Sequence, residues 1–197
     1  MISFLSTIEN RFFDLTKYLH DNPEKSFHEY KSYNYIIKLL QDYNFNISTN
    51  YLNIPTSFLA KFGKGYPKIC FICEYDADDN LGHIYGYNGK TTISAAAAIM
   101  LSKILPKVNG TCIVLGCPGE ILHGSKTTMF KQGTFDDIDA VLAVQPHAVT
   151  AQSGSSMATL PIKFKFEVDN TSTDLKNTSS CLNTSLITFN TLNALIN

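Results

Sequence analysis

The polar residues that could do chemistry each follow an apolar, strand-like run of the sequence. They are Asp76, Glu120, Gln145 and His147, which follow residues 68–75, 111–117 and 140–144. In an open α/β sheet, the carboxyl ends of parallel strands meet at one edge, so we expect these side chains to lie close together. Carboxylate and imidazole groups can exchange protons with a substrate or bind a metal ion. The pattern predicts a reactive site at this edge.

The elements that must position these residues follow from hydrophobic periodicity and turn signals. The sequence predicts helices at 6–20, 23–43, 91–105, 125–132 and 182–196, and strands at 45–52, 58–62, 68–75, 111–117, 140–144 and 160–168. Alternating strands and helices are typical of parallel sheets with right-handed crossovers. We therefore expect an α/β fold in three layers, with a doubly wound, mostly parallel sheet.

Composition and charge limit the partners of the chain. The 197 residues carry a formal net charge of -1 without any block of like charge, which argues against nucleic-acid and anionic-membrane binding. No apolar run approaches the roughly 20 residues that span a bilayer, and the N-terminus lacks the pattern of a secretory signal. The five cysteines are an odd number, which argues against a disulfide framework. We expect a cytoplasmic protein with reduced thiols.

Five short strings occur in an order that resembles a known enzyme family. They are Leu19-His20-Asp21-Asn22-Pro23-Glu24, Glu74-Tyr75-Asp76-Ala77, Gly82-His83-Ile84-Tyr85-Gly86-Tyr87-Asn88, Pro118-Gly119-Glu120 and Val144-Gln145-Pro146. Over about residues 11–168 the chain resembles the amidohydrolase branch of the zinc-dependent aminoacylase and carboxypeptidase family, which cleaves dipeptides and N-acyl amino acids. The resemblance implies a truncated chain, with part of the catalytic domain at 1–157 and a remnant of the lid or dimerisation domain at 158–197.

The resemblance also implies roles for individual residues. Family members hold two zinc or manganese ions, which lower the pKa of a bridging water. The matched ligand positions are Tyr85, Tyr87, Ile121 and Gln145, and Glu120 matches the general base. Phenol, alkyl and amide groups are poor zinc ligands, so we expect no cofactor and no di-zinc site in this chain. The two tyrosine rings could simply fill the former metal cavity as part of the core.

Other interpretations of the same residues remain open. Glu120 is either a relic general base or an anion that favours the start of the following helix. Asp76 either bridges or orients metal ligands, or it belongs to a turn with Asp78, Asp79 and Asn80. A different metal site would combine these two carboxylates with three histidines, which are His83, His123 and His147.

The leading hypothesis is a degenerate homologue of an amidohydrolase or dipeptidase that lacks hydrolytic activity and acts in binding or interaction. The alternative is an active hydrolase of N-acyl amino acids or dipeptides that uses Glu120 with a rearranged or metal-free site. A truncated sheet would expose an apolar edge, so we expect a homo-oligomer or a second chain to cover it. The sequence does not identify the small-molecule or peptide ligand.

Overall fold

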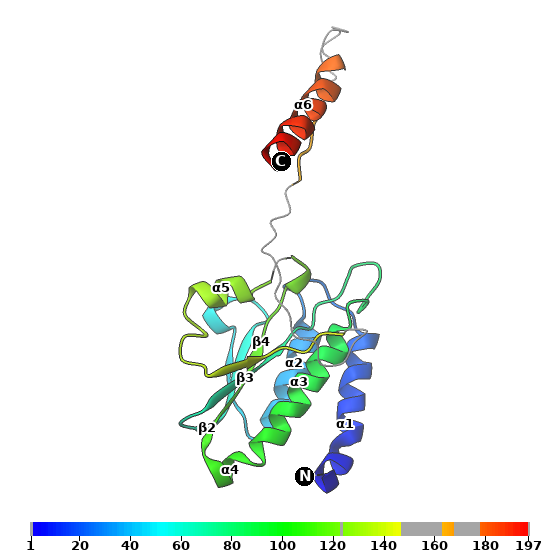
Figure 1. Cartoon of the computed structure of the whole chain (residues 1–197). Coiled ribbons are helices and arrows are strands. Elements are labelled where there is room, and N and C mark those ends of the chain that lie inside the picture. Colours follow the sequence, from blue (N-terminus) through cyan, green and yellow to red (C-terminus); the bar gives the residue numbers. More distant parts are fainter. Residues whose placement is uncertain (1, 123, 147–162, 168–177, 197) are drawn as a thin grey trace. The chain divides into compact units, whose positions relative to one another are not determined.

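A computed structural model describes residues 2–122, 124–146, 163–167 and 178–196 of the chain (Figure 1). The chain divides into two units, Met1–Thr150 and Ala151–Asn197. The first unit carries the sheet and all of the candidate residues that the structure describes. The assignment of residues 158–197 to a lid domain stays a prediction.

The first unit alternates helices and strands along the chain. Its elements are α1 (Ile2–Asp21), α2 (Tyr30–Asp42), β1 (Asn46–Thr49), the 3-10 helix η1 (Tyr51–Asn53), β2 (Phe58–Lys64), β3 (Lys68–Cys73), α3 (Tyr87–Ser102), α4 (Leu105–Val108), β4 (Gly110–Gly116), the 3-10 helix η2 (Glu120–Leu122), α5 (Lys126–Lys131) and β5 (Ala140–Leu142). Each helix and strand predicted before residue 145 is present, with shifted ends.

The five strands form one sheet in the order β1-β2-β4-β3-β5. Strand β3 pairs in parallel with both β4 and β5, whereas β2 is antiparallel to β1 and to β4. Four strands therefore run in one direction and β2 runs against them. The predicted α/β class with a mostly parallel sheet is confirmed, and the carboxyl ends of β3, β4 and β5 lie at the same edge.

Helices cover both faces of this sheet (Figure 1). On one face, α1, α2 and α3 pack on alternate strand residues such as Phe71 and Val114. On the other face, Met129 of α5 packs on Ile72 and Leu115. Successive strand residues point to opposite faces of the sheet, and the residues on each of the two faces are apolar, as in a sheet that is buried on both sides. The result is the expected three-layer arrangement.

Helix α1 shows why the sequence forms these layers. Its residues Ile8, Phe12, Leu15 and Leu19 recur every three or four positions and are all buried. At 3.6 residues per turn this spacing places them on one face of the helix. Across the interface with α3, Thr16 Oγ1 donates to Thr92 Oγ1 at 2.9 Å.

The second unit differs from its prediction in two places. Residues 163–167 form neither helix nor strand, so the strand predicted at 160–168 is absent from its described part, and the remainder lies outside the described residues. Helix α6 (Thr178–Ile196) begins earlier than predicted and exposes Leu186, Ile187 and Phe189. Among the helices that the structure describes, none has the length and apolar character to cross a membrane.

Candidate functional site

The loops that leave β3 and β4 bring three carboxylates to the predicted edge of the sheet. Glu74 and Asp76 follow β3 and are 2% and 0% exposed, while Glu120 follows β4 and begins η2. A carboxylate that is buried to this degree needs hydrogen bonds or opposite charges to remain ionised. Glu74 is paired with opposite charges, whereas Asp76 accepts hydrogen bonds through one of its two oxygens.

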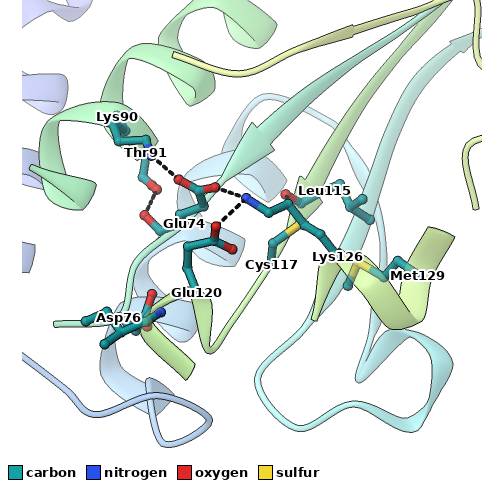
Figure 2. A network of polar contacts seen from close by, with 10 residues as sticks. Glu74, Asp76, Lys90, Thr91, Leu115, Cys117, Glu120, Lys126 and Met129 are labelled. Atoms are coloured by element: carbon teal, nitrogen blue, oxygen red, sulfur yellow. Dashed lines mark hydrogen bonds and ion pairs between the residues drawn. The ribbon is translucent and has the colours of Figure 1, made fainter. Parts of the chain in front are cut away.

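Two lysines from separate helices pair with Glu74 and Glu120 (Figure 2). Lys90 of α3 forms an ion pair with Glu74 Oε2, and Lys126 of α5 forms one with Glu74 Oε1. Lys126 Nζ also lies 2.9 Å from Glu120 Oε1. We call Glu74, Lys90, Lys126 and Glu120 the ion-pair cluster. It links the ends of two neighbouring strands to both helical layers.

These contacts shift the pKa values of the cluster. Burial alone would raise the pKa of Glu74, but hydrogen bonds from Lys126 and Lys90 outweigh burial and lower it. Burial likewise opposes the charge on Lys126, yet its bonds to Glu74 and Glu120 raise its pKa. Both groups are therefore charged at neutral pH. Sequence reasoning missed Lys90 and Lys126, because neither stands in a string that carries the resemblance.

Asp76 fixes the loop that carries Glu120. Its Oδ2 accepts hydrogen bonds from Ser26 Oγ at 2.8 Å and from Ile121 N at 2.9 Å. Asp76 Oδ1 is buried and has no hydrogen-bond partner among the described residues. The turn considered for Asp76 is instead made by Asp78, whose Oδ1 accepts from Asn80 N at 2.9 Å.

A second buried carboxylate, Glu29, holds the same loop and was not singled out in the sequence. Its Oε1 accepts hydrogen bonds from Gly119 N at 2.9 Å and from Phe27 N at 2.8 Å, and its Oε2 accepts one from Thr56 Oγ1 at 2.5 Å. Burial raises the pKa of Glu29. Gly119 has a φ of +73°, and a Cβ atom there would lie 2.3 Å from the Phe27 ring. The backbone at Gly119, directly before Glu120, therefore packs tightly against Glu29 and Phe27.

A pocket of about 400 Å³ opens beside the ion-pair cluster. Its lining includes Tyr85, Tyr87, Lys90, Glu120 and Gln145. The rings of Tyr85 and Tyr87 lie 5.8 Å apart, and Lys90 Nζ lies 4.6 Å from the centre of the Tyr87 ring. We call this cavity the tyrosine pocket. Burial, followed by the charges of Asp76, Glu120 and Glu74, raises the pKa of Tyr87, so its phenol stays neutral.

The structure brings together three of the four positions matched to metal ligands. Tyr85, Tyr87 and Gln145 line the tyrosine pocket, whereas Ile121 lines a neighbouring cavity with Ser26 and Asp78. The two tyrosine rings do not close the cavity as core residues would. Tyr85 is 52% exposed, and the pocket beside it stays open.

The histidines predicted as an alternative metal site are only partly within the described chain. Both ring nitrogens of His83 are shielded from solvent, and burial lowers the pKa of its imidazole. His123 and His147 lie outside the described residues. Within the described ranges, no group of three His, Cys, Asp or Glu side chains could hold a metal ion.

The chain is similar to named hydrolases, although no family model matches it. It is 33% identical over 177 residues to a p-aminobenzoyl-glutamate hydrolase subunit of Escherichia coli, covering 80% of this chain and 37% of that protein. It is 32% identical over 107 residues to the Xaa-Arg dipeptidase of Mus musculus, covering 49% of this chain and 25% of that protein. The chain thus spans well under half the length of these relatives.

Solved structures show the same fold. A dinuclear metal-binding peptidase of the M20 family from Bacillus subtilis matches with a TM-score of 0.59 and 20% identity, over 69% of this chain and 42% of that one. An aminobenzoyl-glutamate utilization protein from Klebsiella pneumoniae matches with a TM-score of 0.55 and 14% identity, over 71% of this chain and 44% of that one. At these identities the matches support the architecture.

The comparisons correct one expectation. We expected no cofactor, but the similar Bacillus subtilis protein is a dinuclear metal-binding peptidase. That expectation is therefore wrong. The described side chains at the matched positions are nonetheless phenols, an alkyl group and an amide, and Glu74 and Glu120 are paired with lysine. These side chains do not fit two metal ions held in the manner that the resemblance implies.

Three observations agree with one another. The order of the sequence strings, the sheet topology shared with solved structures and the identity to two named hydrolases all point to the same group of enzymes. The chain is therefore a relative of amidohydrolases and dipeptidases, and it has the fold of an M20-family peptidase.

Proposed function

We propose that this domain binds a small ligand in the tyrosine pocket and does not hydrolyse the amide bonds that its relatives cleave. The observation that carries the proposal is the ion pair between Glu120 and Lys126. A general base must present a free oxygen to the proton that it removes. Glu120 Oε1 is instead engaged by an ammonium group, and Glu120 Oε2 is shielded from solvent, so neither oxygen is presented to a water molecule.

Lys126 cannot be displaced from Glu120 at low cost. The same ammonium group also pairs with Glu74, whose side chain is 2% exposed. Moving Lys126 away would leave a buried carboxylate with a single partner, and uncompensated buried charge is strongly unfavourable. The arrangement therefore stabilises the pocket in a form in which Glu120 is occupied.

The pocket has the character of a binding site. It is concave, it combines aromatic and apolar walls with a few polar groups, and its volume of about 400 Å³ lies in the range of small-molecule sites. Tyr85 and Gln145 are exposed to that cavity and are free to contact a ligand.

The test is a hydrolysis assay on the purified chain, with p-aminobenzoyl-glutamate as substrate and with added zinc or manganese. We expect no turnover above the protein-free control. Turnover that is lost in Glu120→Gln, and retained in the exposed control Glu9→Gln, would contradict the proposal and establish the active-hydrolase alternative.

We also propose that a second polypeptide covers the edge of the sheet at β5, the simplest being another copy of this chain. Val141 and Leu142 of this three-residue strand are 45% and 47% exposed, and β5 pairs with β3 on one side. The Escherichia coli relative is named as one subunit of a hydrolase, which supports assembly. Residues 1–157 and 158–197 remain proposed as catalytic-type and lid-type parts of the assembly.

Light scattering during gel filtration tests the assembly. We expect a mass of at least twice the 21.9 kDa of one chain, reduced to that of one chain by Leu142→Lys. The matched control is Phe130→Lys, which changes an exposed apolar residue of α5. A single-chain mass for the unmodified protein would refute assembly from copies of this chain.

A further inference from the structure

We propose that the ligand of the tyrosine pocket is a small organic ammonium, such as a primary amine with a short apolar body. This inference rests on the proposed binding function and names the chemical class that the site accepts. It follows from the charge around the pocket, from two buried oxygens without partners, and from the walls of the cavity.

The charges around the pocket do not balance. Three carboxylates gather there, those of Glu74, Asp76 and Glu120, against the two ammonium groups of Lys90 and Lys126. Among these five side chains this leaves one negative charge. In a partly buried site such a charge attracts a monovalent cation more strongly than it would in bulk water.

Two oxygens of these carboxylates lack partners. Asp76 Oδ1 and Glu120 Oε2 are both buried and accept no hydrogen bond from the described residues. Glu120 lines the pocket, whereas Asp76 is fully buried behind it and acts there through its charge, as it does on Tyr87. Figure 2 shows Asp76 and Glu120 at one end of the cluster, with the Glu120 carboxylate turned toward Lys126. Buried acceptors normally have partners, and an ammonium group brings three donors.

The walls of the pocket suit an organic cation. Tyr85 and Tyr87 present two rings that lie 5.8 Å apart, and the face of an aromatic ring attracts a cation. Ile84 and Pro146 add apolar surface for the body of the ligand. An anion would find no free ammonium group in the lining, because Lys90 is held by Glu74 and lies over the Tyr87 ring.

The experiment is calorimetric titration of the full chain with three probes of similar shape, namely n-butylammonium, butanamide and butanoate. A chelator is present, and the ionic strength is held constant. We expect n-butylammonium to bind at least about tenfold more tightly than butanamide, and butanoate to bind most weakly. Equal binding of the three probes, or a preference for butanoate, would overturn the inference.

Variants locate the binding. Tyr85→Leu removes a ring that is 52% exposed and should weaken n-butylammonium binding about two- to fivefold. Tyr30→Leu removes a ring that is 55% exposed on α2 and should leave binding unchanged. Glu120→Gln removes the residual charge and should weaken binding about tenfold or more. Equal effects of the two tyrosine substitutions would refute the site, and circular dichroism verifies that each variant is folded.

The two proposals fail separately. Turnover in the hydrolysis assay would remove the proposed function, whatever the titrations show. Absence of turnover together with preferred binding of butanoate or butanamide would leave the binding function in place and refute the ammonium ligand.

Discussion

Replacement of Lys90 by methionine tests the energetic role of the ion-pair cluster. The side chains of Lys90 and Glu74 are 5% and 2% exposed, so their ion pair is shielded from water. Removing one partner of such a pair costs about 3–5 kcal/mol, because the other charge stays buried. Glu74 keeps Lys126, and we therefore expect the lower end of this range, about 3 kcal/mol. Methionine preserves most of the apolar stem of lysine.

Urea unfolding followed by circular dichroism measures this loss. With a slope of about 2 kcal/mol per molar urea, the midpoint of Lys90→Met should fall by about 1.5 M. The exposed control Lys131→Met should change stability by less than about 0.5 kcal/mol. The double variant Lys90→Met/Glu74→Gln should recover about 1–2 kcal/mol, because it removes the buried charge that Lys90 no longer compensates.

The result that would refute this reasoning is a midpoint of Lys90→Met within about 0.3 M of the unmodified protein, which is the effect of an ordinary surface substitution. A double variant less stable than Lys90→Met would also contradict it. That result would mean that the charge of Glu74 stabilises the fold even without Lys90.

Three further predictions concern other parts of the domain. The ion pairs outweigh burial and lower the pKa of Glu74 below its usual 4.5, so the stabilisation that the ionised Glu74 provides is present above pH 4.5 and is lost as the pH falls. The urea midpoint should therefore drop more steeply below pH 4.5 in the unmodified protein than in Glu74→Gln. Gly119→Ala should lower the free energy of unfolding by about 2–4 kcal/mol, since its φ is +73° and its Cβ would meet the Phe27 ring, and a loss under about 0.5 kcal/mol would contradict this fit. Four of the five thiols are buried, and burial raises the pKa of one of them, Cys70, to about 12, whereas Cys181 is partly exposed. A thiol reagent at pH 8 should therefore modify Cys181 rapidly and the other four slowly, and rapid modification of two cysteines would contradict this prediction.

Much of the fold was predictable from the sequence because apolar spacing is a local signal. Runs such as residues 68–73 are apolar at nearly every position, which indicates a strand buried on both faces, and they form β3. Cys70 and Cys73, three positions apart, lie in the cores on opposite faces, as expected for a strand. The edge at which Asp76 and Glu120 meet also follows from the order of strands and helices alone.

The ion-pair cluster was not predictable in the same way. Lys90 and Lys126 are 36 positions apart, and no local pattern indicates that both ammonium groups reach Glu74. The strand predicted at 160–168 failed in its described part, because alternation of apolar and polar residues predicts a strand only when neighbouring strands or a core are available to it. The ion-pair cluster and the missing strand depend on charge pairing and packing between distant residues, which a short stretch of sequence does not reveal.

Strand β5 has a consequence for the motions of the domain. It contributes three residues, all exposed, and pairs with β3 at Ile69, Cys70 and Phe71. The two strands in the centre of the sheet, β3 and β4, pair over six positions and are largely buried. Local opening needs little energy where few apolar contacts are broken. In a single chain, backbone amides of residues 140–142 therefore exchange with solvent deuterium by separation of this one strand, whereas those of β4 exchange only when the whole domain unfolds.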